Sequence, residues 1–200
     1  MFIYKWNLRL ARQKTVTDEA ILDAALAVMT RGGPEAVTFA SVGREVGLSA
    51  ATLVQRYPTK AEFLRAALLR AWDHLDAQTA ELDATAEVSP EGAVAMLVAM
   101  FPAQEDAASY AESLLILRED MRDPVLRARG VRWGEALARA LGRRLTRDPA
   151  RRQLLGRLMA SQWQGAQLWW AFSREGDPAS IIGRELRDWC EVMLAGEKRP

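Results

Sequence analysis

Residues 38–60 read TFASVGREVGLSAATLVQRYPTK, and the fold of the chain is organised around them. Apolar residues at the spacing of a small three-helix core are interrupted by boundary signals. Gly47 ends one helix, Ser49 caps the next, and Pro58 cannot continue it. Two short helices with about three residues between them cannot lie flat side by side, so the second projects from the core. The stretch predicts a helix-turn-helix whose second helix, from Ser49 to Tyr57, fits a DNA major groove.

The composition favours a helical protein. The chain has 200 residues, 50% of them apolar, and shows little of the β-branched alternation typical of strands. One cysteine, Cys190, excludes an internal disulfide, and one histidine, His74, leaves too few ligands for an ordinary zinc site. Apolar runs fall far short of the roughly 20 residues that cross a bilayer, and the N-terminus lacks a signal-peptide pattern. We expect a cytoplasmic all-α protein with no cofactor and no metal.

The charge is unevenly distributed, although the net charge is only +1. Residues 1–60 carry eight Lys or Arg against five Asp or Glu, whereas the remainder carries 19 against 21. The basic end has the sign that a DNA-binding domain requires. Residues 1–16 form a basic arm that is expected either to contact the minor groove and phosphates or to be a solvated terminus. Its basic residues are Lys5, Arg9, Arg12 and Lys14.

Helix signals continue on both sides of the central stretch. Thr17 caps a first helix that ends at the Gly-Gly-Pro of residues 32–34. Thr59 and Glu62 have the spacing of a capping box, which opens a long fourth helix to about Leu82. Beyond a polar linker, a cap followed by proline recurs at Ser89-Pro90, Asp123-Pro124, Asp148-Pro149 and Asp177-Pro178. With Pro102 as a further divider, these starts predict helices over about 90–101, 103–119, 124–146, 149–174 and 178–196.

The predicted architecture is therefore all-α, with about nine helices in three parts. The basic arm covers residues 1–16, and the three-helix helix-turn-helix domain covers residues 17–60. The long fourth helix joins this domain to a C-terminal helical bundle, and residues 61–200 together form the domain expected to bind a ligand and to dimerise.

The central residues also resemble a known family. A glycine-ended first helix is followed by Thr38-Phe39, Val42, Gly47-Leu48-Ser49, Thr52-Leu53, Tyr57-Pro58, Lys60 and Phe63-Leu64. Over roughly residues 15–70 this order resembles the DNA-binding domain of the tetracycline-repressor (TetR) family. The resemblance implies a bacterial transcriptional repressor that binds a palindromic operator in double-stranded DNA as a homodimer and is released by a small apolar or aromatic effector.

Two positions depart from the pattern of that family. Val54 stands where a phosphate-contacting tyrosine is common, and Gly43 stands where alanine is common, which should loosen the second helix slightly.

An enzyme is not expected. The single histidine, His74, lies within a long amphipathic helix and cannot serve a nucleophilic triad there, and the chain has no glycine-rich phosphate loop.

The candidate DNA contacts lie around the projecting helix. Ala50, Ala51 and Gln55 should face outward early in this helix, where Gln55 can pair with adenine through two hydrogen bonds. The other candidates, several of them for phosphate contacts, are Thr38, Ser41, Arg44, Ser49, Thr52, Arg56, Tyr57 and Lys60. The alternative for Gln55 and Arg56 is an ordinary solvated helix face.

The bundle carries most of the seven tryptophans of the chain. They could stack on a flat or apolar effector, or they could fill a loosely packed core or a dimer interface. The candidate ligand contacts are Trp72, His74, Trp133, Trp163, Gln167 and Trp170. Several glycines in predicted helices permit close helix approach or leave cavity space: Gly130, Gly134, Gly142, Gly156 and Gly165.

The last two predicted helices show more apolar width than one buried face needs. The resemblance implies that about residues 149–196 form a homodimer interface, and the alternative is a monomeric core. A second function also stays open at this point. The chain could be a helical interaction protein or a small-molecule-binding protein that does not bind DNA.

Overall fold

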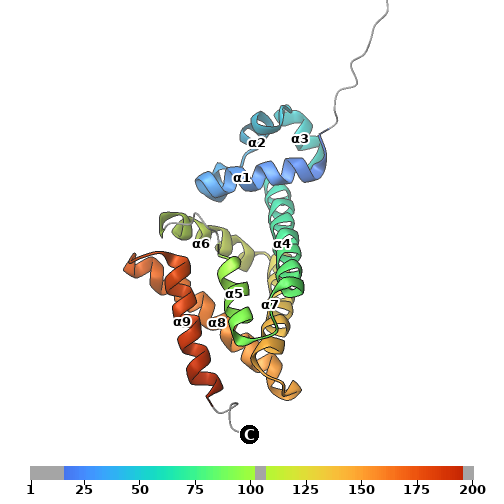
Figure 1. Cartoon of the computed structure of the whole chain (residues 1–200). Helices are drawn as coiled ribbons and strands as arrows, with labels where there is room; N and C mark the ends of the chain where they lie inside the picture. The colour runs from blue at the N-terminus through green and yellow to red at the C-terminus, as the bar shows by residue number, and fades with distance from the viewer. Residues whose placement is uncertain (1–15, 102–106, 196–200) are drawn as a thin grey trace, which may run out of the picture.

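The computed structural model describes residues 16–101 and 107–195, and all regular elements in these ranges are helices. The prediction of an all-α fold is confirmed. The nine helices of the described residues (Figure 1) are α1 (Asp18–Ala36), α2 (Phe39–Val46), α3 (Ala50–Arg56), α4 (Lys60–Thr85), α5 (Pro90–Ala99), α6 (Ala107–Arg122), α7 (Pro124–Leu145), α8 (Pro149–Ser173) and α9 (Pro178–Leu194). No helix in the described part of the chain is both long and apolar enough to cross a membrane.

The predicted helix starts are confirmed by local hydrogen bonds. The side chains of Ser89, Asp123, Asp148 and Asp177 each accept from a backbone N–H two or three residues ahead, and a proline occupies the first turn in every case. Three boundaries differ from the prediction, and one of them is the end of α6, which continues to Arg122, past residue 119. Helix α4 continues to Thr85, about one turn beyond Leu82, and α1 is kinked rather than ended at residues 32–34. Pro102 lies outside the described residues.

Helices α1 to α3 form a head around a first apolar core. Ile21, Val42 and Leu53 are fully buried there. Phe63, from the first turn of α4, is also fully buried, and its ring stacks on Phe39 at 5.4 Å between ring centroids. The first core therefore extends past residue 60, so the head holds the beginning of α4.

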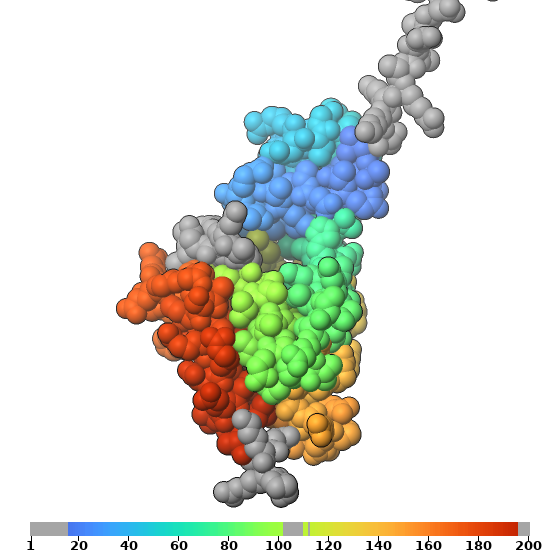
Figure 2. All heavy atoms as spheres, in the orientation of Figure 1, coloured from blue at the N-terminus to red at the C-terminus, as the bar shows by residue number. Residues whose placement is uncertain are grey.

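Helices α5 to α9 form a body around a second core, which Figure 2 shows as a larger lobe beneath the head. The long helix α4 runs from one lobe into the other (Figure 1). Trp72, midway along α4, packs against both cores. Helix α4 therefore links the two lobes, together with Ile116 of α6 and Leu126 of α7, which also pack against the first core.

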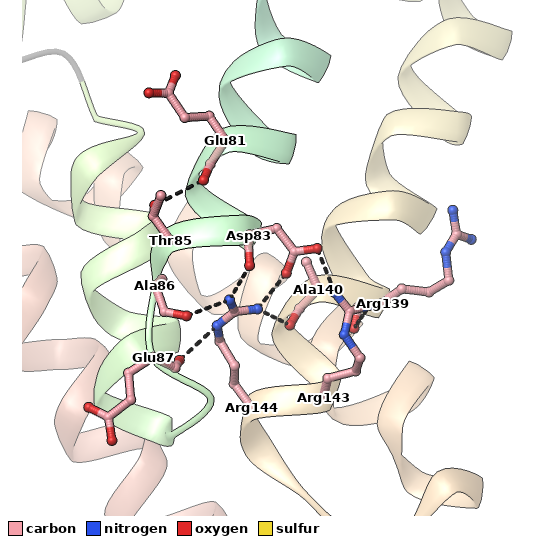
Figure 3. Close-up of polar contacts among 9 residues, drawn as sticks. All are labelled: Glu81, Asp83, Thr85, Ala86, Glu87, Arg139, Ala140, Arg143 and Arg144. Atoms are coloured by element: carbon pink, nitrogen blue, oxygen red, sulfur yellow. Dashed lines mark hydrogen bonds and ion pairs between the residues drawn. The ribbon is translucent and has the colours of Figure 1, made fainter.

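Ion pairs and polar contacts fix α4 to α7 along much of its length. Arg129 of α7 bonds Asp73 and Asp76 of α4, with 2.6 Å between the paired atoms in each case. Close to the end of α4, Arg144 of α7 is buried among the carboxylate of Asp83 and backbone carbonyls of the α4 C-terminus, as Figure 3 shows. These contacts make α4 and α7 a paired unit.

Helices α7 and α8 approach closely because glycines lie between them. A Cβ atom on Gly156 would lie 1.8 Å from the carbonyl oxygen of Ala138, and one on Gly142 would lie 2.1 Å from that of Arg152. Since both neighbours are backbone atoms, larger residues would force the helices apart. Of the two expectations for helix glycines, close approach holds for this pair. A Cβ on Gly134 or Gly165 would instead meet open space.

Candidate nucleic-acid interface and ligand site

The α2–α3 turn is built by three local signals. The side chains of Thr38 and Ser41 exchange hydrogen bonds with each other's backbone N–H groups in a capping box at the start of α2. Gly47 ends α2 in the left-handed conformation with φ of 70°, and the Ser49 side chain accepts from the N–H of Thr52 to start α3. The predicted helix-turn-helix is thus confirmed in its boundaries.

Gly43 has a structural role that its departure from the family pattern did not indicate. It is buried, and a Cβ atom at this position would lie 2.5 Å from the carbonyl oxygen of Leu48. The carbonyl oxygen of Gly43 also accepts from the N–H of Leu48 at 2.9 Å. The expectation of a slightly loosened helix therefore misses the main effect, because this glycine lets the turn fold back tightly onto α2.

The outer face of α3 is exposed, as the helical period predicts. Leu53 is fully buried in the head core, whereas Ala50, Ala51 and Gln55 are exposed. Val54 shares the exposed side, with 43% of its surface accessible. A face of small side chains around one amide can approach base edges closely.

Arg56 and Tyr57 do not point freely outward. Arg56 donates through Nη1 to the carbonyl oxygen of Val16 at 2.9 Å and to the carboxylate of Asp18 at 3.0 Å. Tyr57 packs its ring on Phe63 at 4.8 Å between centroids, and burial raises the pKa of its hydroxyl. A phosphate contact by Arg56 stays a prediction, and in this structure a carboxylate and a carbonyl of the head hold its guanidinium.

The other candidate DNA contacts surround α3. Arg44 is exposed on α2, and Thr52 is half-buried, with its hydroxyl 2.8 Å from that of Ser49. Ser41 donates its hydroxyl proton to the carbonyl oxygen of Ala36. Lys60 is exposed at the N-terminus of α4, with Nζ 3.4 Å from the carboxylate of Glu35. Arg44 and Lys60 therefore remain the accessible cations among these candidates.

The predicted basic arm falls almost wholly outside the described residues, which begin at Val16. Arg56, at the end of α3, holds the backbone of Val16. The described chain therefore begins beside the projecting helix.

The six candidate ligand residues divide into separate groups. His74 lies on the outer side of α4, where its Nε2 is 3.3 Å from the carboxylate of Asp23 in α1, and 51% of its side chain is exposed. Arg70 bonds the same carboxylate and thereby holds the pKa of Asp23 below its ordinary value. His74 thus lies at the contact between α4 and the head, apart from the other candidate ligand residues, and its role in ligand binding stays a prediction.

Trp72 and Trp133 form a second group between α4 and α7. Their ring centroids are 5.8 Å apart. The indole N–H of Trp72 donates to Asp120, whose pKa is raised by burial, and that of Trp133 donates to the hydroxyl of Thr79, each at 3.0 Å. Because both indoles already have acceptors, this pair is explained by packing and internal hydrogen bonding.

Trp163, Gln167 and Trp170 form the third group, on one buried face of α8. All three side chains are at least nine-tenths buried. The amide of Gln167 donates to the carbonyl oxygen of Trp163 at 3.3 Å, and Trp170 meets Phe101 edge-on at 5.8 Å between centroids. The helix thus brings three predicted ligand residues to one place in the body core.

A groove lies beside this face, between α7 and α8. It has a volume of about 580 Å³, and its lining includes Trp133, Leu137 and Ala160, with Glu135, Arg157 and Gln164 among its polar members. Trp133 and Leu137 also belong to the body core that holds Trp163 and Trp170. The groove is thus a candidate approach to that core.

Other chemistry is limited in the described part of the chain. No cluster of three or more His, Cys, Asp or Glu residues there could hold a metal ion. Cys190 is buried, and burial raises the pKa of its thiol to about 11. Since the thiolate is the nucleophile, this thiol is inert near neutral pH.

Sequence comparisons concentrate on the head. The family model described as bacterial regulatory proteins, tetR family, matches residues 21–67. The HTH-type transcriptional repressor KstR of Mycolicibacterium smegmatis is 39% identical over 59 residues, which cover 30% of this chain and 29% of the repressor. The alignment thus spans less than a third of the length of this curated relative.

Structural comparisons extend the likeness to the whole fold. A transcriptional regulator from Rhodococcus sp. Rha1 matches with a TM-score of 0.73 and 19% identity, over 92% of this chain and 100% of that one. A transcriptional regulator from Saccharomonospora viridis, solved in complex with choline, matches with a TM-score of 0.67 and 22% identity, over 86% and 93% of the two chains. At these identities the likeness shows the fold alone.

Proposed function

Because the chain belongs to the TetR family of bacterial regulatory proteins, we propose that it represses transcription by binding a near-palindromic DNA operator as a homodimer. A small effector in the body would release it. The family is one of transcriptional regulators, which are not enzymes. The observation that carries the proposal is the projecting α3, whose outer residues Ala50, Ala51 and Gln55 are exposed above a head core that fixes the helix.

The accessible cations around α3 support a DNA contact. In this proposal the exposed side chains of Arg44 on α2 and Lys60 at the start of α4 contact phosphates, and the exposed Gln55 contacts a base edge. Arg56 acts indirectly in this proposal, since it braces the end of α3 against α1. The basic arm, which is attached at Val16 beside α3, would add further phosphate contacts.

Exposed apolar side chains on α8 and α9 support a homodimer. Large side chains with more than a third of their surface accessible include Leu154, Leu158, Leu168, Trp169, Phe172, Val192 and Met193. Five of them form a stripe along α8, and Gly165 lies on the same side with open space above it. A stripe of this kind fits the close approach of helices from a second subunit.

A DNA titration tests the central claim. Selection from random duplexes with the full chain should enrich a near-palindrome whose half-sites lie about one helical turn apart or somewhat more. Binding to it should weaken steeply with salt, because phosphates supply much of the affinity. Arg44→Gln should lower the slope of log K against log[salt] by about 1 per subunit.

The matched control for this experiment is Arg139→Gln. Arg139 is an exposed helical arginine like Arg44, but it lies on α7 in the body, so its variant should keep the parent slope. No sequence enrichment, with a flat response to salt, would favour the alternative of a helical protein that does not bind DNA.

A second prediction concerns the dimer. The rings of Trp169 and Phe172 lie 5.8 Å apart on the surface, with 69% and 73% of each residue exposed. Trp169→Glu with Phe172→Glu should convert the dimer to a monomer in sedimentation velocity, because two carboxylates would be buried without partners. Met121→Glu, at a residue 60% exposed on α6, should leave the dimer intact. A parent chain that sediments as a monomer would refute the interface.

A further inference from the structure

The buried face of α8 presents two indole N–H groups that have no acceptor. Trp163 and Trp170 are 6% and 5% exposed, and Nε1 of each has no hydrogen-bond partner in the described structure. The indoles of Trp72 and Trp133 are bonded at 3.0 Å. Buried donors are almost always paired, since an unpaired one loses its hydration without compensation. Two such donors on one face need an explanation.

The two donors lie on one line along the helix. Residues 163, 167 and 170 are four and three positions apart, which places them on the same side of α8. Gln167 lies between the two tryptophans and is 8% exposed. Its amide donates a hydrogen bond to the carbonyl oxygen of Trp163. The rest of this neighbourhood belongs to an apolar core that includes Phe101 and Met159. The face therefore offers hydrogen-bond donors within apolar surroundings.

The buried face itself offers no charge to a ligand. Among the buried residues of the described chain, Arg144 is the only charged one, and Asp83 together with the end of α4 already occupies its guanidinium. A ligand ion placed among these side chains would lose its hydration and gain no counter-charge. Such a face favours an uncharged molecule.

We propose that the effector is an uncharged, mainly apolar molecule with at least one carbonyl oxygen, which accepts a hydrogen bond from Nε1 of Trp163 or Trp170. This inference rests on the proposed function, because it names the chemistry of the effector in that function. In this proposal the molecule reaches the two indoles from the α7–α8 groove, whose lining residues Trp133 and Leu137 belong to the same core as Trp163 and Trp170. A permanent cation such as choline does not fit the requirement.

A matched pair of probes tests this proposal. Acetophenone and α-methylstyrene have nearly the same shape, but the carbonyl oxygen of the first is a CH₂ group in the second. With the full chain, acetophenone should bind about tenfold tighter, the factor that one net hydrogen bond supplies. The indole proton signal of Trp163 or Trp170 should move downfield in NMR spectra of ¹⁵N-labelled protein, and only with acetophenone.

Three conservative variants assign the donor. Trp163→Phe and Trp170→Phe each remove an N–H while keeping an aromatic ring, and at least one of them should abolish the preference for acetophenone. Trp72→Phe is the control, because it also removes an indole N–H, but one that the Asp120 carboxylate already accepts. The control variant should keep the preference of the parent chain for acetophenone over α-methylstyrene. The shift measured on the parent chain gives the answer even where a variant folds poorly.

Several results would overturn the proposal: no binding of either probe, equal binding of the two, no shift of the two indole signals, or tighter binding of choline than of acetophenone. Retardation of the selected operator by the unliganded chain is measured alongside. If retardation persists while the probe test fails, only the effector chemistry is wrong. If the chain retards no DNA, the proposed function itself fails.

Discussion

Replacing Arg144 with alanine is expected to lower the free energy of unfolding by about 3–5 kcal/mol, the range for breaking a buried ion pair by removing one partner. The Arg144 side chain has 1% of its surface exposed, and its guanidinium donates five hydrogen bonds. They reach the Asp83 carboxylate and the backbone carbonyls of Asp83, Ala86, Glu87 and Ala140. Figure 3 shows these acceptors arranged around one side chain.

The acceptors explain why the loss is large. Asp83, Ala86 and Glu87 lie at and just beyond the end of α4, where carbonyls have no partner within the helix. Removing Arg144 leaves several of these partly buried acceptors without a donor, and it detaches the end of α4 from α7. Urea denaturation followed by circular dichroism measures the change.

Arg143→Ala is the matched control. Arg143 bonds the same carboxylate of Asp83, but 47% of its side chain is exposed. Exposed ion pairs contribute about 0–1 kcal/mol, so this variant should lose little stability. Equal losses in the two variants would show that the buried hydrogen bonds are not what stabilises the end of α4.

The same cluster also links stability to pH. Burial of Asp83 raises the pKa of its carboxyl, but hydrogen bonds from Arg144 and Arg143 outweigh burial and leave the pKa below its ordinary value. A carboxyl with a lowered folded-state pKa stabilises the fold above its unfolded-state pKa, near 4, and this contribution is lost as the pH falls through the folded value. The parent chain should thus lose stability in acid more steeply than Arg144→Ala.

Phe63→Ala should have a comparable effect on the head, again about 3–5 kcal/mol, because it removes a fully buried aromatic side chain. The ring of Phe63 contacts Phe39 of α2 and Tyr57 at the end of α3. The cavity would therefore open where α4 meets the projecting helix.

The Phe63→Ala substitution should destabilise the head and weaken DNA binding while the body stays folded. Backbone amides of α1 to α3 should exchange faster in hydrogen-exchange measurements, those of α8 should keep their protection, and operator affinity should fall. Phe63→Leu keeps most of the volume and should lose only about 1 kcal/mol. Unchanged exchange in the head of Phe63→Ala would contradict the placement of this ring at the junction.

The sequence predicts the helices well because their boundaries depend on near neighbours. The caps by Thr38, Ser49, Thr59 and Asp123 use side-chain acceptors and backbone donors no more than three residues apart. Glycine at position 47 marks the end of α2 for an equally local reason, its left-handed conformation. The family resemblance rests on this same local pattern.

The candidate site was only partly predictable. The helical period places Gln55 on the exposed side of α3, and it places Trp163, Gln167 and Trp170 on one face of α8. It does not show that Asp18 and Val16 hold Arg56, because those residues are about 40 positions away. Nor does it show that His74 faces Asp23 across the α1–α4 contact.

The sequence by itself therefore determined the all-helical fold, the helix boundaries and the projecting α3, since each depends on periodicity and on hydrogen bonds between near neighbours. Only the tertiary structure decided which polar groups meet and which stay unpaired. Arg144 forms a hydrogen bond with Asp83, which lies 61 residues earlier in the sequence, whereas the indoles of Trp163 and Trp170 are buried with no acceptor in the described structure. Burial and distant partners arise only when helices pack, so no local pattern encodes them.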